Sequence, residues 1–152
     1  MTRRRYHKRR TSVKRSGLED ALAAQLSGLK IQYEYEPFYI EYTPARPRRY
    51  TPDFVLPNGI IIEAKGYFES SDRSKMIAVR DQHPDLAIRF VFGNADARLS
   101  KTSKTSYGKW ATKKGFKWAD MGTIPTRWLN ETRNEVSLAA IAALKLAQGR
   151  TT

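Results

Sequence analysis

Residues 51–65 read TPDFVLPNGIIIEAK, and this stretch decides the fold of the chain. Two apolar runs flank Pro57-Asn58-Gly59, which predicts a β-hairpin because proline suits the first turn position and glycine accepts the left-handed backbone that closes the turn. Three charged residues, Asp53, Glu63 and Lys65, interrupt these runs. Charged side chains are rarely buried without a partner, so the hairpin either lies at the edge of a sheet or holds its charges for chemistry.

The three-residue loop fixes the register of the predicted hairpin. Its strands are expected to pair Leu56 with Ile60, Val55 with Ile61 and Phe54 with Ile62. The next pair is Asp53 and Glu63, and the Cβ atoms of directly paired residues lie about 4.5–5.5 Å apart. Since side chains alternate along a strand, Lys65 shares the face of these two acids. The other face is predicted to fill the core with Phe54, Leu56, Ile60, Ile62 and Ala64.

Two carboxylates at this separation repel each other unless a cation lies between them. A divalent hard metal supplies such a cation, polarises a phosphoryl oxygen and lowers the pKa of a coordinated water. Lys65 is placed to orient that water or to stabilise negative charge in the transition state. The alternative is a solvated hairpin end at which Lys65 simply pairs with Glu63.

Composition limits the classes of function. The 152 residues, 40% of them hydrophobic, suffice for one compact domain. Twenty-eight Lys and Arg against 15 Asp and Glu give a net charge of +13, which favours a polyanionic partner, either nucleic acid or an anionic membrane surface. Without cysteine and with two distant histidines, any metal is expected to be bound by oxygen. No apolar run approaches the roughly 20 residues of a membrane span, so we expect a soluble, intracellular protein.

The first fifteen residues contain no acid and cannot form a core, which predicts a disordered basic arm. We expect the arm to contact DNA phosphates, although a solubilising tail or an organelle transit peptide has a similar composition. Its basic residues are Arg3, Arg4, Arg5, Lys8, Arg9, Arg10, Lys14 and Arg15.

The rest of the chain mixes helices and strands without a repeat, which indicates an α/β domain. The predicted elements are a helix at 16–29, a strand at 31–42 interrupted at Pro37, an extended proline-rich connector at 43–52, a helix at 72–82, a strand at 87–92, a short helix from Ser106 and a last helix at 135–148.

A second basic cluster contains Lys101, Lys104 and Lys109, for which we expect contacts with the DNA backbone. Tyr107 and Trp110 lie among these lysines, but aromatic residues at helical spacing more often belong to a core than to a base-stacking surface. His83 precedes Pro84 and is expected to end a helix, without a catalytic role.

PD at 52–53 with E-x-K at 63–65 resembles the PD-(D/E)xK nuclease signature. Eight motifs, one of which contains this PD, extend the pattern along the chain. In order along the chain, they are SGLED at 16–20, YEYE at 33–36, YTPDF at 50–54, LPNGI at 56–60, ES.DR at 69–73, QHP at 82–84, TSYG at 105–108 and IP..W at 124–128. The motifs occur in the same order in the phage endonuclease I family of Holliday-junction resolving enzymes, which the chain resembles over roughly residues 16–130.

The resemblance implies a restriction-endonuclease-like core, a mixed sheet flanked by helices, within a nuclease domain at 16–130. The predicted C-terminal helix at 131–152 follows this domain and lies outside the resemblance. It also implies a domain-swapped homodimer in which residues 43–52 form a bridge between two composite active sites. The implied activity is the hydrolysis of four-way and branched DNA with two Mg²⁺ ions per site, or with Mn²⁺.

The same resemblance implies the site residues. Asp53, Glu63 and Lys65 would be the catalytic residues of the hairpin, and the partner chain would contribute Glu19. The implied metal ligands are Asp53, Glu63, Glu19 and the backbone carbonyl of Ala64. Without the resemblance, Glu19 would be interpreted as a capping-box partner of Ser16.

The bridge carries Arg46, Arg48 and Arg49, which either contact phosphates or are simply solvated. We therefore interpret the chain as a structure-selective endodeoxyribonuclease. Two alternatives remain at this point. One is a PD-(D/E)xK nuclease that cleaves DNA ends, as a transposase-like subunit does. The other is a non-enzymatic basic nucleic-acid-binding protein.

Overall fold

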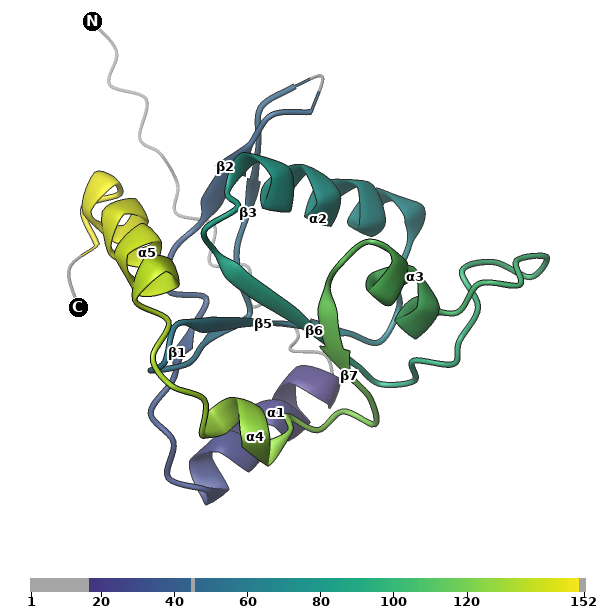
Figure 1. Ribbon diagram of the computed structural model, residues 1–152, viewed down its shortest axis with the longest axis horizontal. Coiled ribbons are helices and arrows are strands. Elements are labelled where there is room, and N and C mark those ends of the chain that lie inside the picture. The colour runs from purple at the N-terminus through teal and green to yellow at the C-terminus, as the bar shows by residue number, and fades with distance from the viewer. Residues whose placement is uncertain (1–16, 45, 151–152) are drawn as a thin grey trace, which may run out of the picture.

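The computed structural model describes residues 17–44 and 46–150, so the predicted arm at 1–15 and Ser16 lie outside the described residues. Figure 1 labels its elements. In chain order they are α1 (Gly17–Gly28), β1 (Glu34–Tyr35), β2 (Ile40–Tyr42), β3 (Arg48–Tyr50), β4 (Phe54–Val55), β5 (Ile60–Lys65), α2 (Ser70–Gln82), β6 (Ala87–Phe92), α3 (Tyr107–Lys113), β7 (Lys117–Ala119), α4 (Thr126–Leu129) and α5 (Glu135–Ala147). The mixed α/β class is confirmed.

A five-stranded mixed sheet organises the described residues, with the strand order β1-β4-β5-β6-β7. The pairs β1–β4 and β4–β5 are antiparallel, and the pairs β5–β6 and β6–β7 are parallel. Helices α2 and α3 are the two crossovers and lie on one side of the sheet, while α1 and α4 lie on the other (Figure 1). Because β5 is the central strand, the hairpin that carries the charges is not at the edge of the sheet.

The β4–β5 hairpin has the predicted register. Phe54 pairs with Ile62 and Val55 with Ile61, and the Leu56 amide donates to the Ile60 carbonyl at 2.8 Å. Gly59 has a φ of +88°, and a Cβ there would come within 3.0 Å of Leu138 and of the Asn134 carbonyl in the chain that leads into α5. The turn therefore requires glycine both for its backbone conformation and for space.

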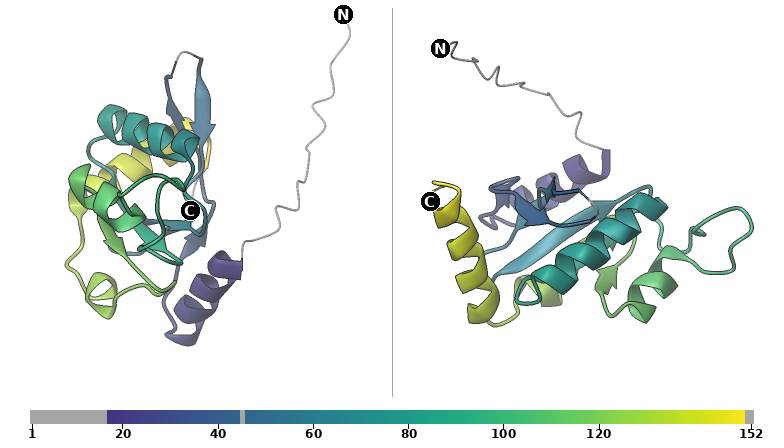
Figure 2. Two further views of the ribbon diagram at one scale, coloured as in Figure 1. Left: turned by 90° about the vertical axis from the view of Figure 1, so that its right-hand side faces the viewer. Right: turned by 90° about the horizontal axis from the view of Figure 1, so that it is seen from above.

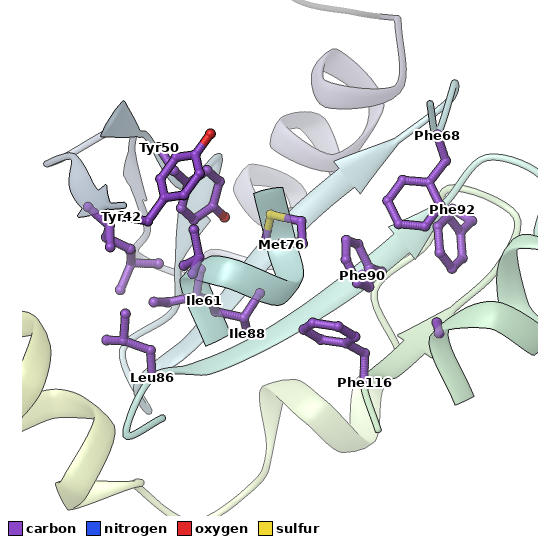
Figure 3. Close-up of a cluster of buried hydrophobic side chains, with 14 of the residues drawn as sticks. Tyr42, Tyr50, Ile61, Phe68, Met76, Leu86, Ile88, Phe90, Phe92 and Phe116 are labelled. Atoms are coloured by element: carbon purple, nitrogen blue, oxygen red, sulfur yellow. The ribbon is translucent and has the colours of Figure 1, made fainter. Parts of the chain in front are cut away.

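Two hydrophobic clusters cover the two faces of β5. The predicted core face packs against Leu22 and Leu26 of α1 and contains Phe54, Leu56, Ile60, Ile62 and Ala64. The other face packs Ile61 against Met76 of α2 within an aromatic cluster, part of which Figure 3 shows. Tyr107 and Trp110 are buried in that cluster, which confirms them as core residues.

The connector at 43–52 differs from the prediction, because part of it is a strand. Strand β3 pairs antiparallel with β2, with Ile40 opposite Tyr50 and Tyr42 opposite Arg48. This small second sheet is separate from the main one and projects beside α2 (Figure 2), so the prolines at 44, 47 and 52 remove no hydrogen bond from a central strand.

The helices largely follow the predictions. Helix α2 begins at Ser70, two residues before the predicted start, because Glu69 and Asp72 form a capping box there. His83 is the C-cap of α2, and α3 has Ser106 as its N-cap. The short elements β7 and α4 were not predicted. Within the described part of the chain, no helix combines the length and the apolar character needed to cross a bilayer.

Candidate active site

Asp53 lies directly before β4 and is held by the neighbouring strand. Its Oδ2 accepts a hydrogen bond from the backbone amide of Ala64 at 2.8 Å. Burial and the nearby charge of Glu63 raise the pKa of Asp53 to about 8, although the Ala64 hydrogen bond acts in the opposite direction. Burial and repulsion by Glu63 thus disfavour the ionised form of Asp53 unless a cation binds beside it.

Glu63 of β5 is 3% exposed, and partners hold both of its carboxylate oxygens. The Tyr50 hydroxyl donates to Oε2 at 2.5 Å, and Nζ of Lys65 lies 3.1 Å from Oε1. Glu63 is therefore not at a solvated hairpin end, although Lys65 does pair with it, as that alternative expected. A glutamate on the central strand, with helices on both faces of the sheet, cannot be solvated like a loop residue.

Lys65, at the end of β5, bridges two acids. Its Nζ lies 3.1 Å from Glu63 Oε1 and 3.4 Å from Asp72 Oδ1 on α2. Burial lowers the pKa of Lys65, but the charges of Glu63 and Asp72 outweigh burial and raise the pKa above its usual value. The two acids therefore favour the charged form of Lys65 in this arrangement.

Asp72 keeps its charge in this arrangement. Burial raises the pKa of Asp72, but Lys65 and Lys75 outweigh burial and lower the pKa overall. Nζ of Lys75 lies 3.4 Å from the same Oδ1 atom that Lys65 approaches. Lys65 thus has an ionised partner on the helix side as well as on the strand side.

Glu19, in the first turn of α1, lies beside Asp53 in the single chain. Its Oε2 accepts a hydrogen bond from the Tyr35 hydroxyl at 2.6 Å. Glu36 joins the two acids, since its amide donates to the Asp53 carbonyl at 3.1 Å. One carboxylate oxygen from each of Glu19, Glu36 and Asp53 lies within 4.8 Å of the other two, in a group able to bind a metal ion. The predicted Ser16 partner of Glu19 lies outside the described residues.

The chemistry of these donors fits a hard divalent cation. Three carboxylates converge, one of them with a raised pKa, and cations such as Mg²⁺ and Mn²⁺ prefer carboxylate oxygen. The described carboxylate group contains two of the predicted metal ligands, Asp53 and Glu19. Glu63 is not among its three members, and the Ala64 amide is the hydrogen-bond donor to Asp53.

The side chains at the site that sequence reasoning missed include Glu36, Tyr50 and Asp72. Each of these three falls inside a motif of the family resemblance, namely YEYE, YTPDF and ES.DR. The register of the β4–β5 hairpin gives no reason to select any of the three. Glu36 lies in the loop after β1, Tyr50 in β3 and Asp72 in α2.

The predicted DNA-contacting residues do not form one continuous cluster in the described structure. Arg46, Arg48 and Arg49 are exposed on the projecting β2–β3 hairpin. Lys101, Lys104 and Lys109 are exposed on the loop before α3 and on α3 itself, at another part of the surface (Figure 1). The basic residues of the arm lie outside the described residues.

The fold and the site together define a class of protein. Two acids and a lysine on an antiparallel hairpin in the centre of a mixed sheet, with helices on both sides, constitute a PD-(D/E)xK nuclease core.

The chain belongs to the phage endonuclease I family, whose model matches residues 1–148. It is 47% identical over 129 residues to "Endonuclease I" of Escherichia phage T7, a match that covers 84% of this chain and 86% of that protein. It is also 47% identical over 123 residues to "Endodeoxyribonuclease 1" of Enterobacteria phage T3, a match that covers 80% of each chain.

Proposed function

We propose that this chain is a structure-selective endodeoxyribonuclease that hydrolyses phosphodiester bonds in four-way and branched DNA. The observation that carries the proposal is the arrangement of Asp53, Glu63 and Lys65 on the central hairpin, where Glu63 is buried and the other two are partly buried. The printed names of the T7 and T3 relatives, an endonuclease and an endodeoxyribonuclease, support the reaction class. The net charge of +13 supports a polyanionic substrate.

The residues of the chain have distinct roles in this proposal. Asp53, Glu63 and Glu19 would hold divalent metal together with the Ala64 carbonyl, and Glu36 lies beside Asp53 and Glu19. We expect two Mg²⁺ ions in the complete site. When bound, the metal supplies Lewis acidity and makes a water molecule more acidic, so that water is the nucleophile and no covalent enzyme intermediate forms. Lys65, fixed between Glu63 and Asp72, keeps its proton and stabilises the negative charge that develops on the phosphoryl oxygens.

We also propose that the active form is a domain-swapped homodimer. Along the sequence, Glu19 precedes the segment 43–52 and Asp53 follows it. Strand β3 of this segment pairs with β2 of the same chain. If the β2–β3 hairpin opened, residues 17–42 of one chain could occupy the same position on its partner. Each site would then combine Glu19 of one chain with Asp53 of the other.

Mixing two inactive variants tests the composite site. Co-expressed Glu19→Gln and Asp53→Asn chains form heterodimers, in which swapping puts both substitutions in one site and neither in the other. We expect nicking at one of the two symmetry-related positions of a junction, without paired cleavage. If each site belongs to a single chain, every site holds one substitution and no activity returns. Co-expression is essential because swapped subunits exchange slowly.

A single assay tests the proposed activity. An end-labelled four-way junction and a matched linear duplex are incubated with the protein in Mg²⁺, in Mn²⁺ and in EDTA. We expect metal-dependent cleavage of the junction at protein concentrations that leave the duplex intact. Equal cleavage of both substrates would favour a nuclease that acts on DNA ends, and binding without cleavage in either metal would favour a packaging protein.

A further inference from the structure

Tyr50 connects the β2–β3 hairpin to the acidic centre, although its position in the sequence gives no reason to expect this contact. It is the last residue of β3, lies opposite Ile40 of β2, and is 3% exposed. Its ring belongs to the hydrophobic cluster between the sheet and α2, as Figure 3 shows, while its hydroxyl donates to Glu63 Oε2 at 2.5 Å.

We propose that Tyr50 is a positioning residue, one that fixes the Glu63 carboxylate for metal-dependent cleavage and makes its orientation depend on the β2–β3 hairpin. This proposal rests on the proposed function, which assigns Glu63 to the metal-dependent centre. It does not make Tyr50 a catalytic residue, since the hydroxyl contacts Glu63 and would act only through it.

The two oxygens of Glu63 explain why a second donor matters. Lys65 of β5 approaches Oε1 at 3.1 Å, and Tyr50 of β3 donates to Oε2 at 2.5 Å. A carboxylate held at one oxygen can still rotate about its terminal torsion, which has broad minima. Donors at both oxygens fix this rotation, and partners of this kind that orient a metal-associated residue affect metal affinity as well as rate.

The origin of Tyr50 extends the inference to the connector. Tyr50 lies within the segment 43–52, and its place beside Glu63 depends on the pairing of β3 with β2. A change in that pairing, including one that exchanges β2 between two chains, would preserve the Glu63 contact only if an equivalent pairing forms again. The hairpin would therefore couple the conformation of the connector to the geometry of the centre.

The substitution Tyr50→Phe tests the proposal, because it removes the hydroxyl and retains the buried ring. Tyr42→Phe is the matched control. Tyr42 is 6% exposed, belongs to the same cluster and lies on the paired strand β2. The hydroxyl that donates to Glu63 is that of Tyr50 and not that of Tyr42. The readout without catalysis is Mn²⁺ binding by isothermal titration calorimetry. The readout with catalysis is the Mg²⁺ concentration that gives half-maximal junction cleavage.

We expect Tyr50→Phe to weaken Mn²⁺ binding and to raise the half-saturating Mg²⁺ concentration by about 10- to 100-fold, as for other side chains that orient metal ligands. Tyr42→Phe should change either value by less than about 2-fold. On a Glu63→Gln background, Tyr50→Phe should cause no further loss of Mn²⁺ affinity, because both changes act on one carboxylate. Unchanged Mn²⁺ and Mg²⁺ dependence in a folded Tyr50→Phe protein would overturn the proposal.

A second measurement needs no substitution and covers the case in which Tyr50→Phe does not fold. In a crystal structure of the unaltered protein with Mn²⁺, we expect the Tyr50 hydroxyl to remain within hydrogen-bond distance of Glu63. A hydroxyl turned away from Glu63 in that structure would contradict the proposal. If the protein binds Mn²⁺ as expected but cleaves no junction, the proposed function fails while the role of Tyr50 in orienting Glu63 stands.

Discussion

Two antiparallel hairpins of this chain each pair a glutamate with a cation, and burial is what separates them. On β4–β5, Glu63 lies 3.1 Å from Lys65, and their side chains are 4% and 14% exposed. On β2–β3, Glu41 lies 3.6 Å from Arg49, and their side chains are 67% and 64% exposed. The same secondary structure and the same pair of charges therefore occur once in the core and once in solvent.

The difference in burial assigns different work to the two hairpins. An exposed ion pair contributes about 0–1 kcal/mol to stability and breaks readily. The arginines of β2–β3 can therefore exchange a carboxylate partner for a phosphate. Removing one partner of a buried pair costs roughly 3–5 kcal/mol because the remaining charge is left uncompensated. The charges of β4–β5 thus stay where they are, as an active site requires.

The largest expected effect is on the buried hairpin. Asp53→Ala should abolish junction cleavage, because it removes the carboxylate that lies with Glu19 and Glu36 and is anchored to Ala64. Junction binding, measured by gel shift in Ca²⁺, should survive, since removing a negative charge does not weaken a phosphate-facing surface. If this variant cleaved at the rate of the unaltered protein, Asp53 would not be part of the active site.

Lys65→Ala should lower the single-turnover cleavage rate by about 100- to 1,000-fold, the loss typical of removing one transition-state donor. Lys75→Ala is the matched control, because Lys75 approaches the same Asp72 oxygen at the same distance of 3.4 Å but does not contact Glu63. We expect it to change the rate by less than about 3-fold. Equal losses in the two variants would mean that Asp72, and not the charge of Lys65 at the centre, governs the rate.

The contrast between the hairpins also shows what the sequence could predict. The register of β4–β5 followed from the turn residues and the apolar pattern, and the burial of Tyr107 and Trp110 followed from helical spacing. The position of Glu36 could not be predicted, because it depends on a left-handed backbone (φ of +46°) and a hydrogen bond from its amide to the Asp53 carbonyl. Strand β3 was missed because prolines dominate its surroundings, and the Tyr50–Glu63 contact follows from β3.

Replacing Arg46, Arg48 and Arg49 by alanine should weaken junction binding without lowering the cleavage rate at saturating protein. Each phosphate contact contributes about 0.9 to the log–log dependence of duplex DNA affinity on salt, so three lost contacts flatten the slope by up to about 2.7. The measurement is fluorescence anisotropy between 50 and 200 mM salt. An unchanged slope would show that these arginines are only solvated.

The smallest expected effect is on stability. Because the pKa of Asp53 is about 8 in the folded chain and near 4 when unfolded, the folded state binds the extra proton, and stability falls as pH rises between these values. In EDTA, Asp53→Asn should therefore raise Tm, more at pH 9 than at pH 5. A gain of about 1 kcal/mol corresponds to roughly 2–4 °C for a chain of this size. A lower Tm at pH 9 would contradict the raised pKa.

The most direct test compares the same isosteric change in the two hairpins. Glu63→Gln and Glu41→Gln each remove one negative charge from a strand glutamate that faces a cation, and circular dichroism establishes that both proteins are folded. Single-turnover cleavage of a labelled four-way junction in Mg²⁺ is then measured for each. We predict no detectable cleavage by Glu63→Gln and the unaltered rate for Glu41→Gln. Equal rates in the two folded variants would contradict the assignment of catalysis to the buried hairpin.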